Sequence, residues 1–179
     1  MENKGNTMIK SSMTYGLILG IVLVVFSLIT YMLGVIKPPT WVTIINIVIM
    51  IGGVYYGIKK YRDEDLGGEI TYGKAVGYGI LICVFAAVIN SIYTLLLVTV
   101  IDTEYMNKIL SMQEEEMINK GIYTEEQIEL GMEYARKFTS PLIMTISGLF
   151  SGAFFGAIIS LILAIFLKKE KPIFEQKSE

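Results

Sequence analysis

Two groups of acidic residues, 63–65 and the nine acids of residues 102–141, are the side chains in this sequence most suited to acid–base or metal chemistry. The first group, residues 63–65, precedes Gly67 and Gly68 and so begins like a calcium-binding loop. Gly67 stands where the third ligand would be, however, and the terminal acid of such a loop is missing at the required spacing. We therefore expect a solvated turn here and no metal site.

Catalytic chemistry has little support elsewhere in the sequence. Histidine is absent from all 179 residues, which removes the commonest general base and metal ligand of proteins. An enzyme that acts on lipid would need Tyr72, Lys74 and the loop acids to gather at the inner surface of the membrane, but the sequence shows no pair of a nucleophile and a base. The single cysteine, Cys83, lies in an apolar stretch, and we expect it to be a packing residue. The sequence predicts no enzyme activity, no catalytic residue, no metal and no cofactor.

Four apolar stretches make up most of the chain and must position any functional group. None of them carries Asp, Glu, Lys, Arg or His, and each is long enough to cross a bilayer as a helix. Lipid offers no partners for backbone polar groups, so such segments must be helices that pack together. We predict a single all-α membrane domain over residues 1–179, a four-helix transmembrane bundle. The predicted spans are residues 14–36, 41–58, 77–101 and 142–167.

The distribution of Lys and Arg predicts the orientation of the chain. Ten of the 15 lie in the N-terminal arm, the connection between the second and third spans, and the C-terminal tail. The positive-inside rule therefore places both termini in the cytoplasm and the insert of about residues 102–140 outside. The ten are Lys4, Lys10, Lys59, Lys60, Arg62, Lys74, Lys168, Lys169, Lys171 and Lys177.

Small residues recur at intervals of four in the last apolar stretch and therefore lie along one side of its helix. A small-x-x-x-small face lets a second backbone approach closely in lipid. The partner could be the first span or another copy of the protein, and we favour packing within one chain. The candidates are Gly148, Gly152, Gly156, Ser160 and Ala164 in the last span, with Gly16 and Gly20 in the first.

Polar residues at membrane depth are few, and the candidates are Asn46, Asn90 and Thr94, with Ser91 next to Asn90. Such side chains usually form hydrogen bonds across helices, worth on the order of 1 kcal/mol each. A substrate path is the alternative, but ion and proton pathways generally contain an intramembrane charge, and these spans have none. We expect the three residues to hold helices together, whereas in a channel they would face a wet lumen.

The insert before the last span is acidic and helical in pattern. Residues 102–141 contain nine acids and four bases, a net charge of −5. Apolar residues recur at helical spacing on both sides of Gly121, which stands where a helix C-terminus favours a left-handed residue. Thr124 and Gln127 have the spacing of a capping box that starts a second helix. A helical hairpin over Tyr105–Phe138 is therefore predicted.

An amphipathic hairpin in this place has three possible positions. It could lie on the outer leaflet of the membrane, fold back over the bundle, or dock another protein. Covering the bundle or the membrane surface is the expectation that requires no further component.

Several short motifs, in this order around the four spans, resemble a known family. They are GGEITYGKA at residues 67–75, GIYTEEQIE at residues 121–129, and Lys137-Phe138 before Pro141 and a glycine-rich last span. Together they resemble the bacterial membrane proteins grouped as domain of unknown function 4199, over nearly the whole chain. The resemblance implies a small protein of the bacterial cytoplasmic membrane with four helices and an outer insert. It brings no known catalytic residues.

These observations predict a multi-pass protein of the bacterial cytoplasmic (inner) membrane that acts as a non-enzymatic interaction or structural component. Its expected partners are the lipid bilayer and either a second copy of the chain or a membrane or extracytoplasmic protein. No nucleic acid partner is expected. The alternative function is that of a small transporter or channel subunit.

Overall fold

The computed structural model describes residues 4–169, and within them the chain is helical with no β-strand. Two helices continue into short π-helical segments, labelled η1 and η2. The basic residues Lys171 and Lys177 lie outside the described residues. The elements are α1 (Lys4–Met32), α2 (Thr40–Lys60), η1 (Tyr61–Asp65), α3 (Tyr72–Leu96), η2 (Leu97–Ile101), α4 (Tyr105–Lys120), α5 (Glu125–Phe138) and α6 (Pro141–Leu167).

Four of these helices are long and apolar enough to cross a membrane: α1, α2 with η1, α3 with η2, and α6. This confirms the predicted all-α membrane bundle. The helices differ from the apolar stretches mainly at their ends, because polar flanking residues continue a helix whose backbone bonds are already formed. The first helix thus begins well before Thr14 and ends at Met32, just before Gly34, whose φ is +76°.

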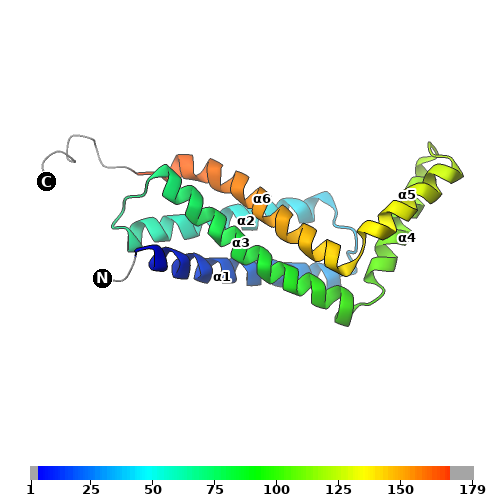
Figure 1. Cartoon of the computed structure of the whole chain (residues 1–179), viewed down its shortest axis with the longest axis horizontal. Coiled ribbons are helices and arrows are strands. Elements are labelled where there is room, and N and C mark those ends of the chain that lie inside the picture. Colours follow the sequence, from blue (N-terminus) through cyan, green and yellow to red (C-terminus); the bar gives the residue numbers. More distant parts are fainter. Residues whose placement is uncertain (1–3, 170–179) are drawn as a thin grey trace, which may run out of the picture.

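The four spans run side by side, and α3 lies between α1 and α6 (Figure 1). Both described ends of the chain lie at one end of the bundle, which we call the terminal end. The helices α4 and α5 form a hairpin at the opposite end, the hairpin end, and leave the bundle obliquely (Figure 1). The hairpin therefore does not fold back over the bundle, which removes one of the three positions considered above.

Close approach to α3 explains the small residues of α1. A Cβ atom added at Gly16 would lie 2.5 Å from Phe85 Cβ and 2.8 Å from the Ile82 carbonyl oxygen. One turn later, a Cβ atom at Gly20 would lie 2.9 Å from Ile89 Cβ. No larger side chain fits these positions unless α3 moves, so the two glycines set the distance between α1 and α3.

The small residues of α6 face α3 from another side. A Cβ atom at Gly156 would lie 2.3 Å from Cys83 Cβ, and one at Gly152 would lie 2.8 Å from Ala87 Cβ. Ser160 is fully buried, with its Oγ 2.5 Å from the Cβ position of Gly79. The partner of this face is thus α3 of the same chain, and the suggestion that it pairs with Gly16 and Gly20 of the first span is wrong. Those glycines contact α3 as well.

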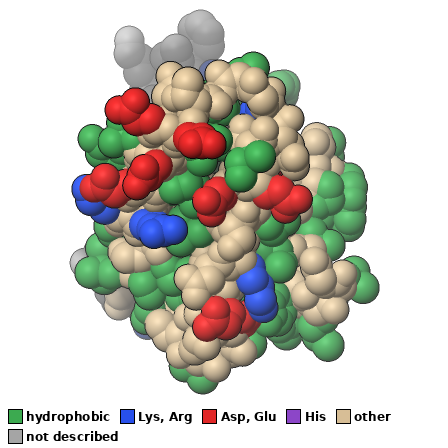
Figure 2. Space-filling view, turned by 90° about the vertical axis from the view of Figure 1, so that its right-hand side faces the viewer, with side chains coloured by type: hydrophobic (Ala, Val, Ile, Leu, Met, Phe, Trp, Pro, Cys, Tyr) green, Lys and Arg blue, Asp and Glu red, His purple; other side chains and the backbone are tan. Residues whose placement is uncertain are grey.

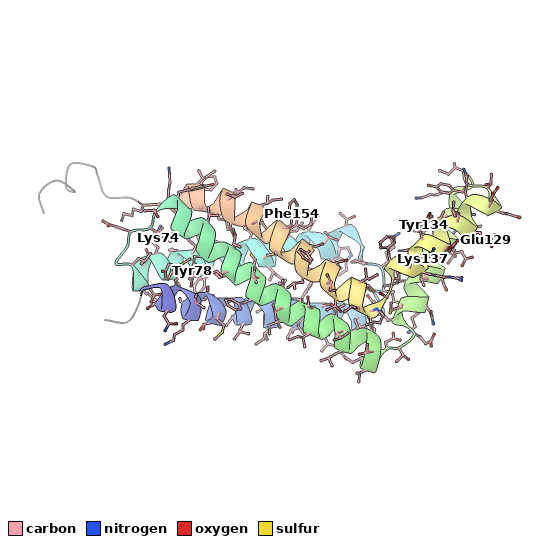
Figure 3. All side chains as sticks on the ribbon, viewed as in Figure 1. Lys74, Tyr78, Glu129, Tyr134, Lys137 and Phe154 are labelled. Carbon is pink, nitrogen blue, oxygen red and sulfur yellow. The ribbon has the colours of Figure 1, made fainter. Side chains whose placement is uncertain are left out.

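Gly148 differs from the other members of this row, because nothing lies within 4 Å of its Cβ position. The small residues of α6 therefore contact α3 at Gly152 and Gly156, but no longer at Gly148, nearer the hairpin end. Large apolar side chains cover the outer surface of α6 instead, including Phe150 and Phe154, which are 71% and 64% exposed (Figure 3). Such a surface is stable only against lipid or another apolar partner.

The terminal end is fastened by aromatic and polar contacts. The rings of Tyr61 and Tyr78 stack with centroids 4.1 Å apart. Ser11 Oγ lies 2.8 Å from Tyr78 Oη and donates to the Asp65 carboxylate at 3.2 Å. Ile70 exchanges two backbone hydrogen bonds with Lys169, both 2.9 Å, which ties the start of α3 to the end of α6.

The acidic residues of η1 take part in the polar contacts at the terminal end. Asp63 accepts hydrogen bonds from Arg62, Glu64 pairs with Lys60, and Asp65 accepts from Ser11. Gly67 and Gly68 take positive φ values of 70° and 95°, which shape the turn into α3. The segment is a tight turn whose three acids pair with neighbouring side chains.

The glycine contacts predict a position-dependent effect on stability. Gly156→Leu forces a bulky side chain against Cys83 and should destabilise the bundle by about 1–3 kcal/mol. Gly148→Leu is the matched control, because its new side chain enters open space on the same helix. Thermal unfolding in detergent should show a lower melting temperature for the first variant alone. Equal melting temperatures would mean that α6 does not approach α3 through this face.

Candidate functional site

The junction between the bundle and the hairpin is built around Asp102. The segment η2 ends with the Asp102 N–H donating to the Leu97 carbonyl at 2.8 Å. The Asp102 side chain is only 9% exposed. Its Oδ2 accepts a hydrogen bond from Lys108 Nζ at 2.7 Å and from Tyr31 Oη at 3.1 Å, while Oδ1 accepts from the Glu104 N–H at 3.2 Å. One carboxylate therefore joins the end of α1, the end of η2 and the first turns of α4.

The charges at this junction stabilise each other. The hydrogen bond from Lys108, with a further contribution from Tyr31, lowers the pKa of Asp102 below its ordinary value. The same bond raises the pKa of Lys108. Burial raises the pKa of the neighbouring Tyr105, whose ring lies 6.2 Å from that of Tyr31. The pair is thus charged, and Tyr105 neutral, throughout the physiological pH range.

A second contact joins α4 to the bundle through the connection between α1 and α2. Lys37, in the connection between α1 and α2, forms an ion pair with Glu116 of α4. Both side chains are about half exposed, so the pair adds little to stability. Beneath it lies a small cavity of about 230 Å³ that Ile36, Pro38, Ile109 and Met112 help to line. The direction of α4 is therefore fixed mainly by Asp102 and secondarily by this contact.

The hairpin turn has the local structure that its sequence predicts. Gly121 ends α4 with a φ of +63°. Thr124 Oγ1 accepts from the Gln127 N–H at 3.3 Å, and the Thr124 N–H donates to Gln127 Oε1 at 3.0 Å, which forms a capping box at the start of α5. Since both bonds lie within three residues, this structure depends on local sequence alone.

The two helices of the hairpin pack through a small contact. Met117 Cε of α4 lies 3.0 Å from the Cβ position of Gly131 in α5, and Met132 is buried beside it. The absence of a side chain at Gly131 lets the helices approach. Met132 is the one buried residue of α4 and α5, whereas Ile118, Leu130, Tyr134 and Phe138 are exposed.

An apolar groove with an acidic rim lies between α4 and α5. Its volume is about 1000 Å³. Apolar side chains form the floor, and the carboxylates outnumber the two cations at the edges. Figure 2, which views the molecule onto the hairpin end, shows Asp and Glu side chains gathered on this face. The lining residues are Glu114, Ile118, Tyr123, Glu125, Ile128, Glu129, Met132, Glu133, Arg136 and Lys137.

Charge is unevenly compensated along this groove. Glu133 pairs with Lys137 at 2.7 Å. Within residues 4–169, Glu114, Glu125 and Glu129 have no ion-pair partner. Four carboxylates and two cations therefore line a partly exposed apolar floor, and this excess of negative charge favours a partner that carries both apolar and cationic groups.

The polar residues predicted to join helices do not do so. Asn46 Nδ2 donates to the Val42 carbonyl and Asn90 Nδ2 to the Ala86 carbonyl, each four residues earlier on its own helix. Thr94 is half-buried in α3 and takes no part in the junction described above. The expectation of hydrogen bonds across helices is therefore wrong for Asn46 and Asn90. Both amides reach the carbonyl four residues earlier on their own helix, and such local hydrogen bonds compete with bonds to a neighbouring helix.

Other residues provide the contacts between spans. Ser91 Oγ of α3 donates to the Thr145 carbonyl of α6 at 3.3 Å, and Tyr72 Oη donates to the Leu161 carbonyl at 3.4 Å. Tyr31 joins Asp102 across 71 positions of sequence. The only sequence signal for the last pair is that each residue stands at the end of an apolar stretch.

The fold and this junction define a class of protein: a small polytopic membrane protein in which four spans support a projecting helical hairpin. A family model described as protein of unknown function (DUF4199) matches residues 14–169. The chain belongs to this family, as its motifs indicated. The matched region includes α4 and α5, so the hairpin is part of what the family model describes. No curated protein and no solved structure matches the chain.

The junction predicts a local effect of removing one charge. Asp102→Asn keeps the shape of the side chain but deprives Lys108 and Tyr31 of a charged acceptor. Amide hydrogen exchange in the first two turns of α4 should become faster, while exchange in α3 and α6 stays slow. Glu104→Gln, in the same turn, is the control and should change the exchange rates much less, since its carboxylate accepts a hydrogen bond only from the Asn107 side chain and acts on Lys108 only through its charge.

The same contact has a predictable dependence on pH. Because the pKa of Asp102 is lowered in the folded protein, its stabilising effect is complete above the ordinary pKa of about 3.9. The effect is lost as the pH falls through the lowered value. Wild-type exchange rates in α4 should thus be constant from neutral pH to about pH 5 after correction for intrinsic rates. A rise within that range would contradict the assigned role of Asp102.

Proposed function

We propose that this protein is a non-enzymatic interaction component of the bacterial cytoplasmic membrane. In this proposal the four spans anchor and orient the hairpin, and the hairpin docks a cationic amphipathic segment of a partner protein. The observation that carries the proposal is the groove between α4 and α5, where Glu114, Glu125 and Glu129 have no ion-pair partner among residues 4–169 and surround an apolar floor. A helix with one apolar and one basic face complements both properties of the groove.

The arrangement of the bundle favours this function over transport. A transporter or channel needs polar groups directed into a shared path. Asn46 and Asn90 instead bind carbonyls of their own helices, and the spans are drawn together through glycine contacts. Rigid support of a binding surface requires only that the bundle be tightly packed.

The proposal includes an orientation. The concentration of Lys and Arg in the two termini and the connection between α2 and α3 supports a cytoplasmic terminal end. The acidic hairpin then faces outward, and its partner is a second membrane protein or an extracytoplasmic protein.

Orientation can be tested with single cysteines in a Cys83→Ser background. Lys120→Cys at the hairpin and Lys74→Cys at the terminal end (Figure 3) should differ in intact cells. Only the cysteine at position 120 should react with a membrane-impermeant thiol reagent, and both should react after the membrane is permeabilised. Labelling of position 74 alone in intact cells would reverse the orientation.

Docking can be tested with a synthetic peptide that forms a helix with lysines on one face and leucines on the other. The purified protein in detergent should bind this peptide and should not bind an analogue in which glutamates replace the lysines. The double variant Glu125→Gln/Glu129→Gln should weaken binding at least tenfold, and added salt should weaken wild-type binding.

The double variant Glu115→Gln/Glu126→Gln is the matched control. It removes the same number of charges from the hairpin, one from α4 and one from α5, but neither residue lines the groove. It should change binding by less than about threefold. If the two double variants weaken binding equally, the peptide recognises net charge and the groove is not the binding site.

A further inference from the structure

The side of α5 away from the groove carries an apolar ridge. It consists of Leu130, Tyr134 and Phe138, which recur every four residues and so lie along one side of the helix. All three are well exposed, at 54%, 56% and 68%. The residue before each ridge residue is charged, and it is turned about 100° around the helix. The ridge is therefore an apolar strip with a charged border.

The ridge is joined to the surface that α6 presents to lipid. Phe138 ends α5 three residues before Pro141, where the last span begins. From there, Leu142, Phe150 and Phe154 continue as large exposed apolar side chains on α6. If α6 crosses the membrane, Phe138 lies at the level where the hydrocarbon ends. The ridge thus starts next to the apolar surface that α6 would present to lipid.

We infer that this ridge rests on the membrane surface, with Leu130, Tyr134 and Phe138 inserted into the interfacial layer of lipid. Tyr and Phe are side chains that favour this layer. Lys137 stands beside the ridge with its Nζ 5.4 Å from the centre of the Tyr134 ring and 2.7 Å from Glu133, so the charges that border Tyr134 compensate each other (Figure 3).

The geometry of the hairpin agrees with this position. Leu130 and Phe138 are eight residues apart, which is about 12 Å along a helix. The interfacial layer of one leaflet is roughly 5–8 Å thick, so an upright hairpin would leave Leu130 in water. The hairpin leaves the bundle obliquely (Figure 1), and that tilt lets all three side chains reach the lipid.

The position also separates the charges of the hairpin from the membrane. Glu125 and Glu129 line the groove, well away from the ridge around α5. Contact of the ridge with lipid keeps these acids away from the phosphate groups and leaves the groove open to the aqueous side. The inference rests on the ridge alone and does not require that the groove bind a partner.

Tryptophan fluorescence provides the test. In a Trp41→Phe background, Leu130→Trp and Tyr134→Trp are made singly, and Glu129→Trp is the control one residue from Leu130 on the charged side. Each protein is reconstituted into phosphatidylcholine vesicles with brominated acyl chains, which quench tryptophan only on contact. The wild-type protein, with Trp41 at the start of the span α2, serves as the positive control.

Emission from positions 130 and 134 should be blue-shifted and quenched at least twofold by brominated lipid, and iodide should have little effect on it. Emission from position 129 should show the reverse. Equal quenching of positions 129 and 130 by the lipid would overturn the inference, because it would show immersion without a preferred face. So would quenching of position 130 by iodide alone. Blue-shifted emission at 130 that neither agent quenches would also overturn it, since the ridge would then be covered by protein.

Discussion

The structure depends on how closely α1 and α6 approach α3. In lipid the surroundings of a helix are as apolar as its neighbours, so the hydrophobic effect does not draw the spans together. Dispersion contacts do so instead, and they become strong only at short distance. Gly16 and Gly20 permit that distance on one face of α3, and Gly152 and Gly156 permit it on another. Cys83 and Ala87 are small enough on α3 to receive α6.

This packing is what makes a rigid junction at the hairpin end possible. Asp102 is held by Tyr31 from α1 and by Lys108 from α4, so its carboxylate transmits the position of the bundle to the hairpin. The bonds would be short-lived if α1 could slide along α3. The Asp102 carboxylate is only 9% exposed, whereas Lys108 is 45% exposed, so solvent and salt reach the ion pair mainly from the Lys108 side. A tightly packed membrane domain and a precisely directed hairpin are therefore two consequences of the same contacts.

The hairpin itself is stabilised differently from the spans. Its helices contact each other mainly through Met117, Gly131 and Met132, and several large apolar side chains, Ile118, Leu130, Tyr134 and Phe138, stay exposed. A two-helix unit this small cannot bury an adequate core by itself. It is stable because its ends are anchored in the bundle and its turn is capped, and its remaining surfaces are free for the groove and ridge contacts proposed above.

The sequence by itself determined the features that depend on residues close together in the chain. Absence of charge over about twenty residues identified the four spans, and Thr124 and Gln127, three positions apart, defined the start of α5. The row of small residues in α6 was also visible as a pattern. In each case the physical cause acts within one or two turns of a helix or along a single span.

Only the tertiary structure decided which surfaces meet. The sequence indicated that Gly152 and Gly156 approach a backbone, but shape complementarity selected Cys83 and Ala87 of α3 rather than the glycines of α1. Asn46 and Asn90 found acceptors on their own helices, and Ser91 made the contact to α6. Tyr31 and Asp102 meet because two packed helices end at the same level. Such choices compare the fit of whole helix faces, and that comparison is not encoded in the spacing of residues along one segment.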